Sequence, residues 1–439
     1  MAGHPLPRRC PTDRRPLPRT SAAALAVVLA VLLAACAGSS TGTELRSSAG
    51  RAPVARSTTQ ATVLANSQLG AELYRQLARQ GGNFSFSPYA TSIALAQLGL
   101  GADGVTATQL AAVQHVADAR ALDAGLNTLM QQIDTRDGDR QNDVRQGHVT
   151  IQIPIAVWGQ LGTHVEQPFL DGLSRWFGAG MRLVDFRSDP AAAHTTIDDW
   201  MGTQTSDQLT QVVPSGQITE ATRLVTTTGT AVAAPWDERF DASRTKQDTF
   251  HPLRGGTEDV TTMSITSSRG LLYDRGDGWQ AVMLPYLGRQ LAMVVIVPEA
   301  GRFGDYEDNL DGPQLQDVLD GMVPTSINLE MPRFQFTSQS NLSGPLTTIG
   351  LGSLFDPGQA RLPGITADEP LWLAAADQQS LLSADEEGSQ ASAPTAVRAQ
   401  PPETPVAVSL DVNRPFVVAV VDRASGEPLL LGRVTDPLS

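Results

Sequence analysis

The segment from Leu381 to Arg433 limits the possible folds of this chain more than any other part of the sequence. An apolar pair runs into Asp385, Glu386, Glu387 and Gly388, and a long stretch rich in small, polar and proline residues follows. Two strand-like apolar runs then close the chain. A loop of this length within a compact region is uncommon and is usually either functional or disordered. Exposed loops of this composition are also preferred sites of proteolytic cleavage.

The composition argues for a folded, acidic protein. Apolar residues make up 41% of the 439 positions, enough for a large core, and the formal net charge is −14. Nucleic-acid binding depends on clustered Lys and Arg, so this charge argues against that class of partner. Residues 99–104 formally fit a dinucleotide-binding glycine pattern, but they follow an expected helix rather than a strand. The six histidines are scattered without ligand spacing, so we expect no metal, no cofactor and no enzymatic activity.

The N-terminus has the pattern of an export signal. Residues 1–20 carry five arginines, and residues 21–35 form an unbroken run of small and apolar side chains. This run is too short for a comfortable membrane span and is typical of a signal peptide, here residues 1–35. Leu33–Cys36 resembles a bacterial lipobox, which implies a lipidated Cys36 and anchoring to the outside of the cell membrane. The alternative is an ordinary secretory signal with a chance cysteine.

Removal of residues 1–35 would leave Cys36 as the only cysteine. A lone cysteine permits no internal disulfide, so the exported protein must be held together by packing. Residues 36–61 are rich in Ser, Thr, Ala and Gly without periodicity, which predicts a flexible tether. The folded domain is expected to span residues 62–439.

Several local patterns predict secondary structure. The repeat of Leu69, Leu73 and Leu77 after Asn66-Ser67 predicts a capped amphipathic helix. Ser87-Pro88 predicts a second helix start, with proline at the first helical position. Thr106 and Gln109 form a capping-box pair that predicts a third helix. Apolar runs predict strands over residues 149–158, 280–285, 291–298 and 328–336, and the second and third of these are expected to pair around a turn.

The order of motifs resembles the serpin family of serine protease inhibitors. Asp385–Ala393 resembles the family's hinge, Asn413–Phe416 and Pro428–Val434 resemble the motifs after its reactive loop, and Asn83–Leu110 resembles its opening segment. Leu346–Phe355 resembles one of the family's helices, which implies a helix over residues 346–355. The resemblance implies an α+β fold with three β-sheets, about eight or nine helices and an exposed reactive-centre loop over about residues 386–408.

The family's activity, if carried over, is inhibition by a suicide-substrate mechanism. A target serine protease, or a cysteine protease, attacks the loop and forms an acyl-enzyme. The cleaved loop then inserts into the main sheet as a new strand and distorts the protease. The inhibitor itself performs no catalysis. We expect a monomer whose partners are the protease and, through Cys36, a membrane.

The alternation of small and polar side chains tests whether the hinge can enter a sheet as a strand. Its expected functional residues are Glu386, Gly388, Ser389, Ala391 and Ala393. If Ser389 enters a sheet facing the core, alternate residues after it are small or apolar, while those between them are mostly polar, as in a half-buried strand. A flexible linker would explain the composition but not this alternation.

Counting along the loop leaves the cleavage site open. The count from Glu386 places the scissile bond after Pro402, and the count back from Asn413 places it after Thr404. A bond before proline resists most proteases, so Glu403-Thr404 is favoured over Pro402-Glu403. A trypsin-like enzyme would cut after Arg398, which shortens the inserting segment, and would treat the protein as a substrate.

A buried polar cluster beneath the main sheet departs from the family's pattern. Ser87 is retained, but Ala90, Thr228 and Gln378 stand where the family usually has Ser, Asn and His. Trp236 matches the tryptophan under the point where the loop enters the sheet. Pro394 falls inside the segment that must insert and would lose a ladder hydrogen bond. These departures keep open an alternative, a non-inhibitory serpin acting as a cell-surface binding or structural module.

Overall fold

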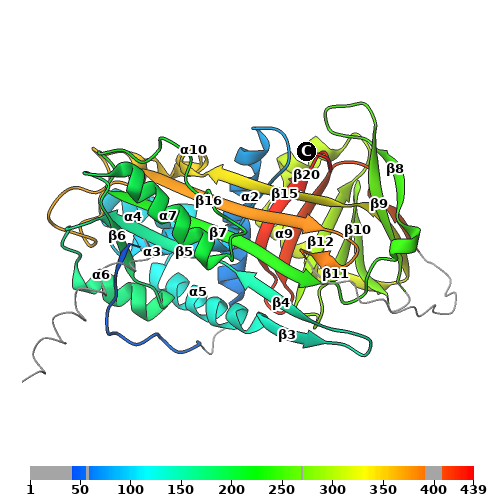
Figure 1. The fold of residues 1–439 in the computed structure, drawn as a ribbon, viewed down its shortest axis with the longest axis horizontal. Helices are drawn as coiled ribbons and strands as arrows, with labels where there is room; N and C mark the ends of the chain where they lie inside the picture. Colours follow the sequence, from blue (N-terminus) through cyan, green and yellow to red (C-terminus); the bar gives the residue numbers. More distant parts are fainter. Residues whose placement is uncertain (1–41, 56–58, 268–269, 391–407) are drawn as a thin grey trace, which may run out of the picture. The chain divides into compact units, whose positions relative to one another are not determined.

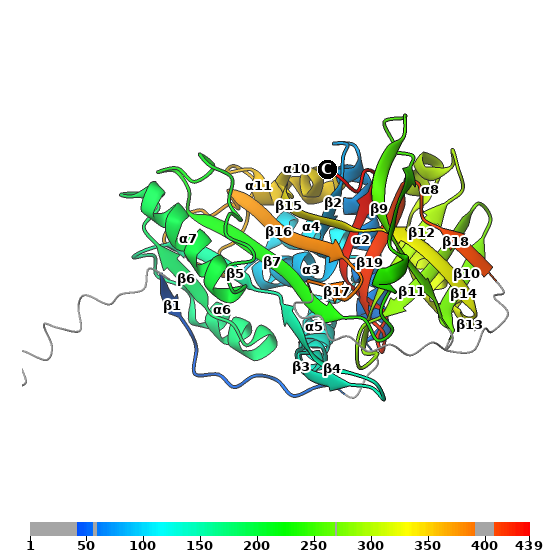
Figure 2. The same cartoon turned by 45° about the vertical axis from the view of Figure 1, so that its right-hand side comes forward.

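Three β-sheets form the framework of the molecule (Figures 1 and 2). The computed structural model describes residues 42–55, 59–267, 270–390 and 408–439. The expected signal peptide and Cys36 therefore lie outside the described residues, as do positions 391–407 of the loop. In the described part, the sheets have nine, seven and four strands, so the expectation of three sheets is confirmed.

The nine-stranded main sheet contains the strands on which the hinge depends. Its continuous path is β1 (Thr43–Leu45), β6 (Met181–Val184), β5 (Ile155–Gln160), β7 (Leu224–Pro235), β16 (Ala375–Ala384) and β15 (Phe334–Asn341). Three more strands join off this path: β4 (Gln146–Gln152) and β17 (Gly388–Ser389) pair with β7, and β3 (Gly138–Gln141) pairs with β4.

The two smaller sheets supply much of the core. The seven-stranded sheet runs β13 (Val323–Thr325), β10 (Leu271–Gly276), β11 (Trp279–Pro285), β12 (Leu291–Pro298), β19 (Phe416–Asp422), β20 (Glu427–Val434) and β2 (Phe84–Phe86). The four-stranded sheet runs β18 (Val408–Asp411), β14 (Ile327–Pro332), β9 (Glu258–Thr266) and β8 (Lys246–Phe250). Every residue of β12, β19 and β20 is buried, which explains their nearly unbroken apolar sequences. The expected pairing of β11 with β12 is confirmed.

Helices cover the sheets, with α7 lying across one face of the main sheet (Figures 1 and 2). The helical segments are α2 (Gln60–Ala78), α3 (Pro88–Gly99), α4 (Gly104–Val113), α5 (Ala119–Ile133), α6 (Gln167–Gly172), α7 (Pro190–Gln204), α8 (Phe303–Asn309), α9 (Gly312–Asp320), α10 (Ser343–Leu346) and α11 (Gly352–Phe355). With α10 and α11 counted as one interrupted helix, the described residues form nine helices. No described helix is both long and apolar enough to cross a bilayer.

The start of α3 is as expected, and it fixes the floor under the main sheet. Ser87 is the N-cap, its hydroxyl accepts a hydrogen bond from Ala90 N at 3.0 Å, and Pro88 is the first helical residue. All residues from Pro88 to Leu98 are buried. A helix without an exposed face must pack on every side, which explains its small and apolar side chains.

Two other helix starts were wrongly predicted. α2 begins at Gln60, so Asn66 lies inside the helix, where its amide donates to Glu427 at 2.9 Å. α4 is capped by Asp103 rather than Thr106. The hydroxyl of Thr106 lies 3.2 Å from that of Ser353 and so ties α4 to α11. Polar residues near a helix start can serve tertiary contacts as well as caps, and their spacing does not distinguish the two.

Three predicted elements are each interrupted. Residues 149–158 form parts of β4 and β5, separated at Pro154, because proline cannot donate to a strand ladder. Residues 328–336 divide at Arg333 into β14 and β15, which belong to different sheets. The helix predicted over 346–355 contains a break at Gly350, whose φ of 120° is open mainly to glycine.

The predicted flexible tether is wrong for the residues from Thr43 to Ala55. β1 pairs antiparallel with β6 and forms an edge of the main sheet. Beyond it, Ala52 N donates to Arg175 O at 2.7 Å, and the Asn127 amide donates to Ala52 O at 3.1 Å. An exposed sheet edge presents unpaired backbone groups that any extended segment can satisfy, whatever its composition.

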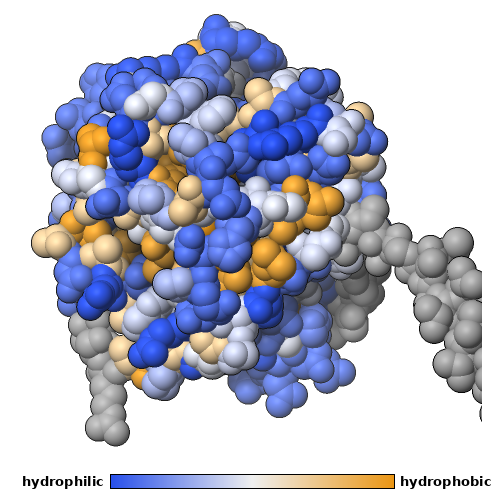
Figure 3. Space-filling view, turned by 90° about the vertical axis from the view of Figure 1, so that its left-hand side faces the viewer, coloured by the Kyte–Doolittle hydropathy of each residue, from blue (hydrophilic) through white to orange (hydrophobic). Residues whose placement is uncertain are grey.

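The end of the molecule that carries α6 and β6 has a mixed surface. Figure 3 shows its apolar residues in small groups, separated by hydrophilic ones. Small separate groups of this kind are normal on a soluble protein.

Candidate hinge and sheet-opening site

Residues Asp385–Gln390 form a tight turn that leaves β16 and doubles back toward β7. The carboxylate of Asp385 accepts hydrogen bonds from the backbone N of Glu387 at 2.8 Å and of Gly388 at 3.0 Å. This is the way an Asp side chain commonly stabilises a turn. A Cβ atom at Gly388 would lie 2.1 Å from Ala234 O, so this position requires glycine.

After the turn, the chain enters the space between β7 and β16. Gly388 and Ser389 pair antiparallel with Pro235 and Ala234 of β7. On the other side, the Ser389 hydroxyl donates to Ser383 O of β16 at 2.7 Å. Ser389 is only 3% exposed, so its side chain is buried. The first residues of the loop therefore already lie between the two strands.

Trp236 forms the base on which the hinge rests. Its backbone N donates to Glu387 O at 2.8 Å, and its indole Nε1 donates to Asp385 O at 2.7 Å. The indole stacks on the ring of Tyr286, with centroids 4.7 Å apart and planes 6° apart. The Tyr286 hydroxyl lies 2.6 Å from the Ser389 hydroxyl. One aromatic pair thus contacts both the turn and the residue that enters the sheet.

The two glutamates of the turn, Glu386 and Glu387, are held by cations from distant parts of the chain. Glu386 pairs with Arg333 and accepts a hydrogen bond from Thr245. Burial alone would raise the pKa of Glu386, but these hydrogen bonds hold it below its usual value. Glu387 pairs with Arg239 at 2.9 Å and with Arg145, from the β3–β4 hairpin, at 3.5 Å. The turn is thus fixed at both of its glutamate side chains.

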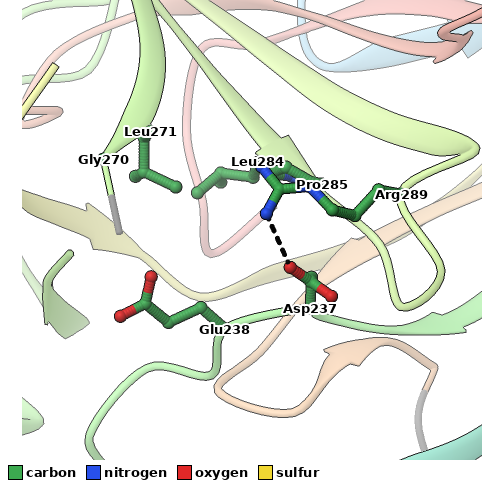
Figure 4. A pocket seen from close by; sticks show the side chains of 7 residues that line it. All are labelled: Asp237, Glu238, Gly270, Leu271, Leu284, Pro285 and Arg289. Atoms are coloured by element: carbon green, nitrogen blue, oxygen red, sulfur yellow. Dashed lines mark hydrogen bonds and ion pairs between the residues drawn. The ribbon is translucent and has the colours of Figure 1, made fainter. Parts of the chain in front are cut away.

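A shallow recess lies beside Trp236 (Figure 4). Asp237 pairs there with Arg289 at 3.2 Å and accepts a hydrogen bond from the Asn142 amide at 3.1 Å. The recess has a volume of about 10 Å³ and is otherwise lined by Glu238, Gly270, Leu271, Leu284 and Pro285. Such a volume holds about one water molecule, so the recess is not a ligand site.

Three of the residues expected beneath the sheet meet in one cluster. The Gln378 amide donates to the Thr228 hydroxyl at 2.7 Å, and its oxygen accepts from Ser87 N at 2.6 Å. All three are buried. Gln378 therefore ties β16 to β7 and both strands to the start of α3. Trp236 lies at the other end of β7, so the expected residues form two sites along one strand pair.

A second polar contact under the sheet was not foreseen. The Ser380 hydroxyl donates to Ser85 O at 2.8 Å, and Ser85 N donates to the Ser338 hydroxyl at 2.8 Å. Gln378 and Ser380 are two residues apart on β16, so both face the core. The spacing of two residues between Gln378 and Ser380 was the signal in the sequence that could have predicted this contact. The hinge arginines and Tyr286 gave none, because their contacts are far apart in sequence.

The remaining predicted site residues lie outside the described part of the chain. These are Ala391, Ala393, Pro394, Arg398, Pro402, Glu403, Thr404 and Cys36. Within the described part, no group of three His, Cys, Asp or Glu side chains could hold a metal ion.

The fold and the hinge define a protein whose main sheet holds the start of a long loop between two of its strands. A model of the family described as serpin (serine protease inhibitor) matches residues 64–437. The chain therefore belongs to the serpin family.

Relatives and solved structures agree with this assignment. The chain is 30% identical over 370 residues to an uncharacterized serpin-like protein of Thermococcus kodakarensis, covering 83% of each chain. It is 28% identical over 389 residues to antithrombin-III of Mus musculus, covering 85% of this chain and 81% of that protein. The native-state crystal structure of tengpin, a thermophilic serpin, matches with a TM-score of 0.79 and 20% identity, over 90% of this chain and 100% of that one.

The polar cluster under the sheet gives a first prediction. Replacing Gln378 by Leu leaves Ser87 N and the Thr228 hydroxyl buried without a partner, each costing about 1–3 kcal/mol. We expect the free energy of unfolding to fall by about 2–4 kcal/mol, measured by urea denaturation of the uncleaved protein. The control is Gln359→Leu at an exposed position, which should change it by less than about 0.5 kcal/mol. Equal midpoints for the two variants would contradict this role of Gln378.

Proposed function

We propose that this serpin inhibits serine-type endopeptidases by cleavage of its loop and insertion of the loop between β7 and β16. The observation that supports this most is the position of Ser389, which is hydrogen bonded to Ala234 of β7 on one side and to Ser383 of β16 on the other. The loop's own N-terminal residues thus mark the path that a longer strand would follow.

The pairing geometry supplies a driving force for insertion. β7 and β16 are parallel neighbours and pair from Ala375↔Val225 to Leu381↔Ala231. A strand continuing from β17 would run antiparallel to both, replacing one parallel ladder with two antiparallel ones. Antiparallel pairing is slightly more stable per residue. A net gain of about ten hydrogen bonds at about 0.5–1.5 kcal/mol each is comparable to the stability of a whole domain.

The relatives support a protease as the partner. Two relatives are named antithrombin-III and two are named leukocyte elastase inhibitor, at 24–30% identity. The sequence after Ser389 alternates small residues with polar ones, which suits a strand buried on one face.

Covalent trapping of a protease tests the proposal. We expect the exported protein to form a complex stable in denaturing gels with at least one enzyme of a panel that includes glutamate-specific, elastase-like and trypsin-like proteases. Ser389→Arg should abolish the complex and leave only cleaved inhibitor, because an arginine does not fit a position that is 3% exposed. The matched control is Ser392→Arg, which the alternation places on the solvent side and which should still form the complex.

Insertion also predicts a change in thermal stability. Cleavage of the loop by a protease that is not trapped should raise the melting temperature by more than about 10 °C, because the added ladders stabilise only the cleaved form. The measurement is differential scanning calorimetry before and after cleavage. An unchanged melting temperature would mean that the cleaved loop stays outside the sheet.

The N-terminal signal supports a further proposal about location. We propose that residues 1–35 are removed and that Cys36 is lipidated and anchors the serpin to the outside of the bacterial cell membrane. Cys36→Ser should move the protein from the membrane fraction to the soluble fraction and abolish labelling with radioactive palmitate. Cys10→Ser, within the removed segment, is the control. Retention of Cys36→Ser in the membrane fraction would contradict the anchor.

A non-inhibitory function remains a second candidate because of Pro394. Proline has no N–H to donate, so it removes one ladder bond from the middle of the segment that must insert. Slow insertion would allow the protease to complete hydrolysis and leave. Clean cleavage of the loop by every protease, without any complex, would therefore favour a binding or structural role.

A further inference from the structure

A buried carboxylate lies in the half of the β7–β16 ladder that is farther from the hinge. Asp377 of β16 pairs with Thr227 of β7 and is only 2% exposed. Because its neighbour Gln378 faces the core, Asp377 faces the other side of the sheet. There it accepts a hydrogen bond from the Asn341 amide at 2.8 Å.

The carboxylate also contacts the segment that joins α7 to β7. The Gln217 amide, in the orientation that satisfies both groups, donates to the two oxygens of Asp377 at 3.2 and 3.3 Å. The same connection also bonds to the sheet at a position nearer the hinge. There Gln211 N donates to the Gln379 side chain at 3.3 Å, and the Gln339 amide donates to Gln211 O at 2.6 Å. The connection therefore links the β7 half of the sheet to the β15–β16 half across its outer face.

Insertion of a strand would have to disrupt these links. A new strand between β7 and β16 breaks the ladder at Asp377↔Thr227 and separates the two halves of the sheet. Gln217 belongs to the connection that leads from α7 into β7, whereas Asp377 and Asn341 lie on β16 and β15. Asp377 is thus placed in the half of the ladder farther from the hinge, through which the opening must pass.

The charges around Asp377 are unusual for a buried carboxylate. In the described part of the chain, no Lys, Arg or His forms an ion pair with it. The charged neighbour that acts on it is another acid, Asp198 of α7. Asp198 accepts hydrogen bonds from Val212 N at 3.0 Å and Val213 N at 3.3 Å, and its other oxygen lies 3.6 Å from His194 Nδ1. β15 and the α7–β7 connection contribute only the neutral amides of Asn341 and Gln217.

We propose that Asp377 is a pH-dependent latch that controls opening of the half of the β7–β16 ladder farther from the hinge. The neutral carboxyl brings no charge into a buried site that contains no cation partner, so it favours the closed sheet even though the two amides hydrogen bond to it. The ionised carboxylate is stabilised by water, which reaches it only when the strands separate. This inference rests on the proposed function to the extent that opening serves loop insertion.

The titration of Asp377 sets the range of pH over which the latch acts. Burial is the largest cause and raises the pKa of Asp377, the hydrogen bonds from Asn341 and Gln217 lower it, and Asp198 raises it. Together these effects move the pKa from 3.8 to about 7. Because the pKa is higher in the closed form, the closed sheet binds more protons than the open one. Its stability is therefore greatest below pH 3.8, falls as the pH rises, and levels off above about pH 7.

Hydrogen–deuterium exchange of the uncleaved protein tests the latch without any protease. We expect the opening equilibrium of residues 375–379 and 224–228, corrected for intrinsic exchange rates, to increase about tenfold between pH 6 and pH 8. Asp377→Asn should remove this increase and keep exchange at the low-pH level at every pH. Asp198→Asn should move the midpoint to lower pH, because it removes the negative charge that opposes ionisation.

A matched control uses another buried acid. Burial raises the pKa of Asp123 on α5 to about 7 as well, but Asp123 is not part of the β7–β16 ladder. Asp123→Asn should leave the pH dependence of exchange at residues 375–379 unchanged. Exchange that is flat with pH in the unmodified protein, or equally steep in Asp377→Asn, would overturn the proposal.

Protease trapping separates this inference from the proposed function. If the serpin inhibits proteases, the fraction trapped rather than released should rise from pH 6 to pH 8 in the unmodified protein but not in Asp377→Asn. If no protease is trapped at any pH, the inhibitory function fails, yet the exchange result still decides the latch.

Discussion

The parallel ladder between β7 and β16 is the interaction on which the rest of this structure depends. It holds the main sheet closed over seven residue pairs, and it ends where the hinge enters. The hinge, the Gln378 cluster and Asp377 all lie along this ladder. Trp236 and the hinge are at one end, the Gln378 cluster is beneath its middle, and Asp377 is next to Gln378 on the opposite face of the sheet. The strands of this ladder are parallel, and parallel pairing is slightly less stable per residue than antiparallel pairing.

The polar residues under the ladder show how specificity can be built into a core. Gln378 bonds to partners on two other elements, Ser87 and Thr228, and leaves none of them unpaired. A fully satisfied buried network fixes one register of the strands, since a shift by one residue would bury several donors without acceptors. A single long amide bridges β7 and α3 here.

Much of the hinge could be predicted from the sequence because its constraints are local. The turn depends on Asp385 and Gly388, which stand three residues apart, and the alternation after Ser389 follows from strand geometry. The meeting of Ser87, Thr228 and Gln378 was predicted through resemblance to the family, since no property of the separate segments brings them together. The cations that hold Glu386 and Glu387 could not be found, because Arg145, Arg239 and Arg333 are far from them in the chain.

The failed predictions have a common cause. Composition and spacing describe what a segment prefers alone, whereas Thr106, Asn66 and the residues around Thr43 are determined by partners elsewhere. Asn66 has the right chemistry for a cap but donates to buried Glu427 instead. Gly350 interrupts a helix whose pattern is otherwise regular.

The strand at the sheet edge has a mechanical consequence. β1 pairs with β6 from Thr43↔Leu183 to Leu45↔Met181, so the backbone of the N-terminal segment is part of the same hydrogen-bonded network as β5 and β7. Tension applied to the chain before Thr43 would therefore act first on the β1–β6 hydrogen bonds, and these bonds would pass the load to the rest of the main sheet.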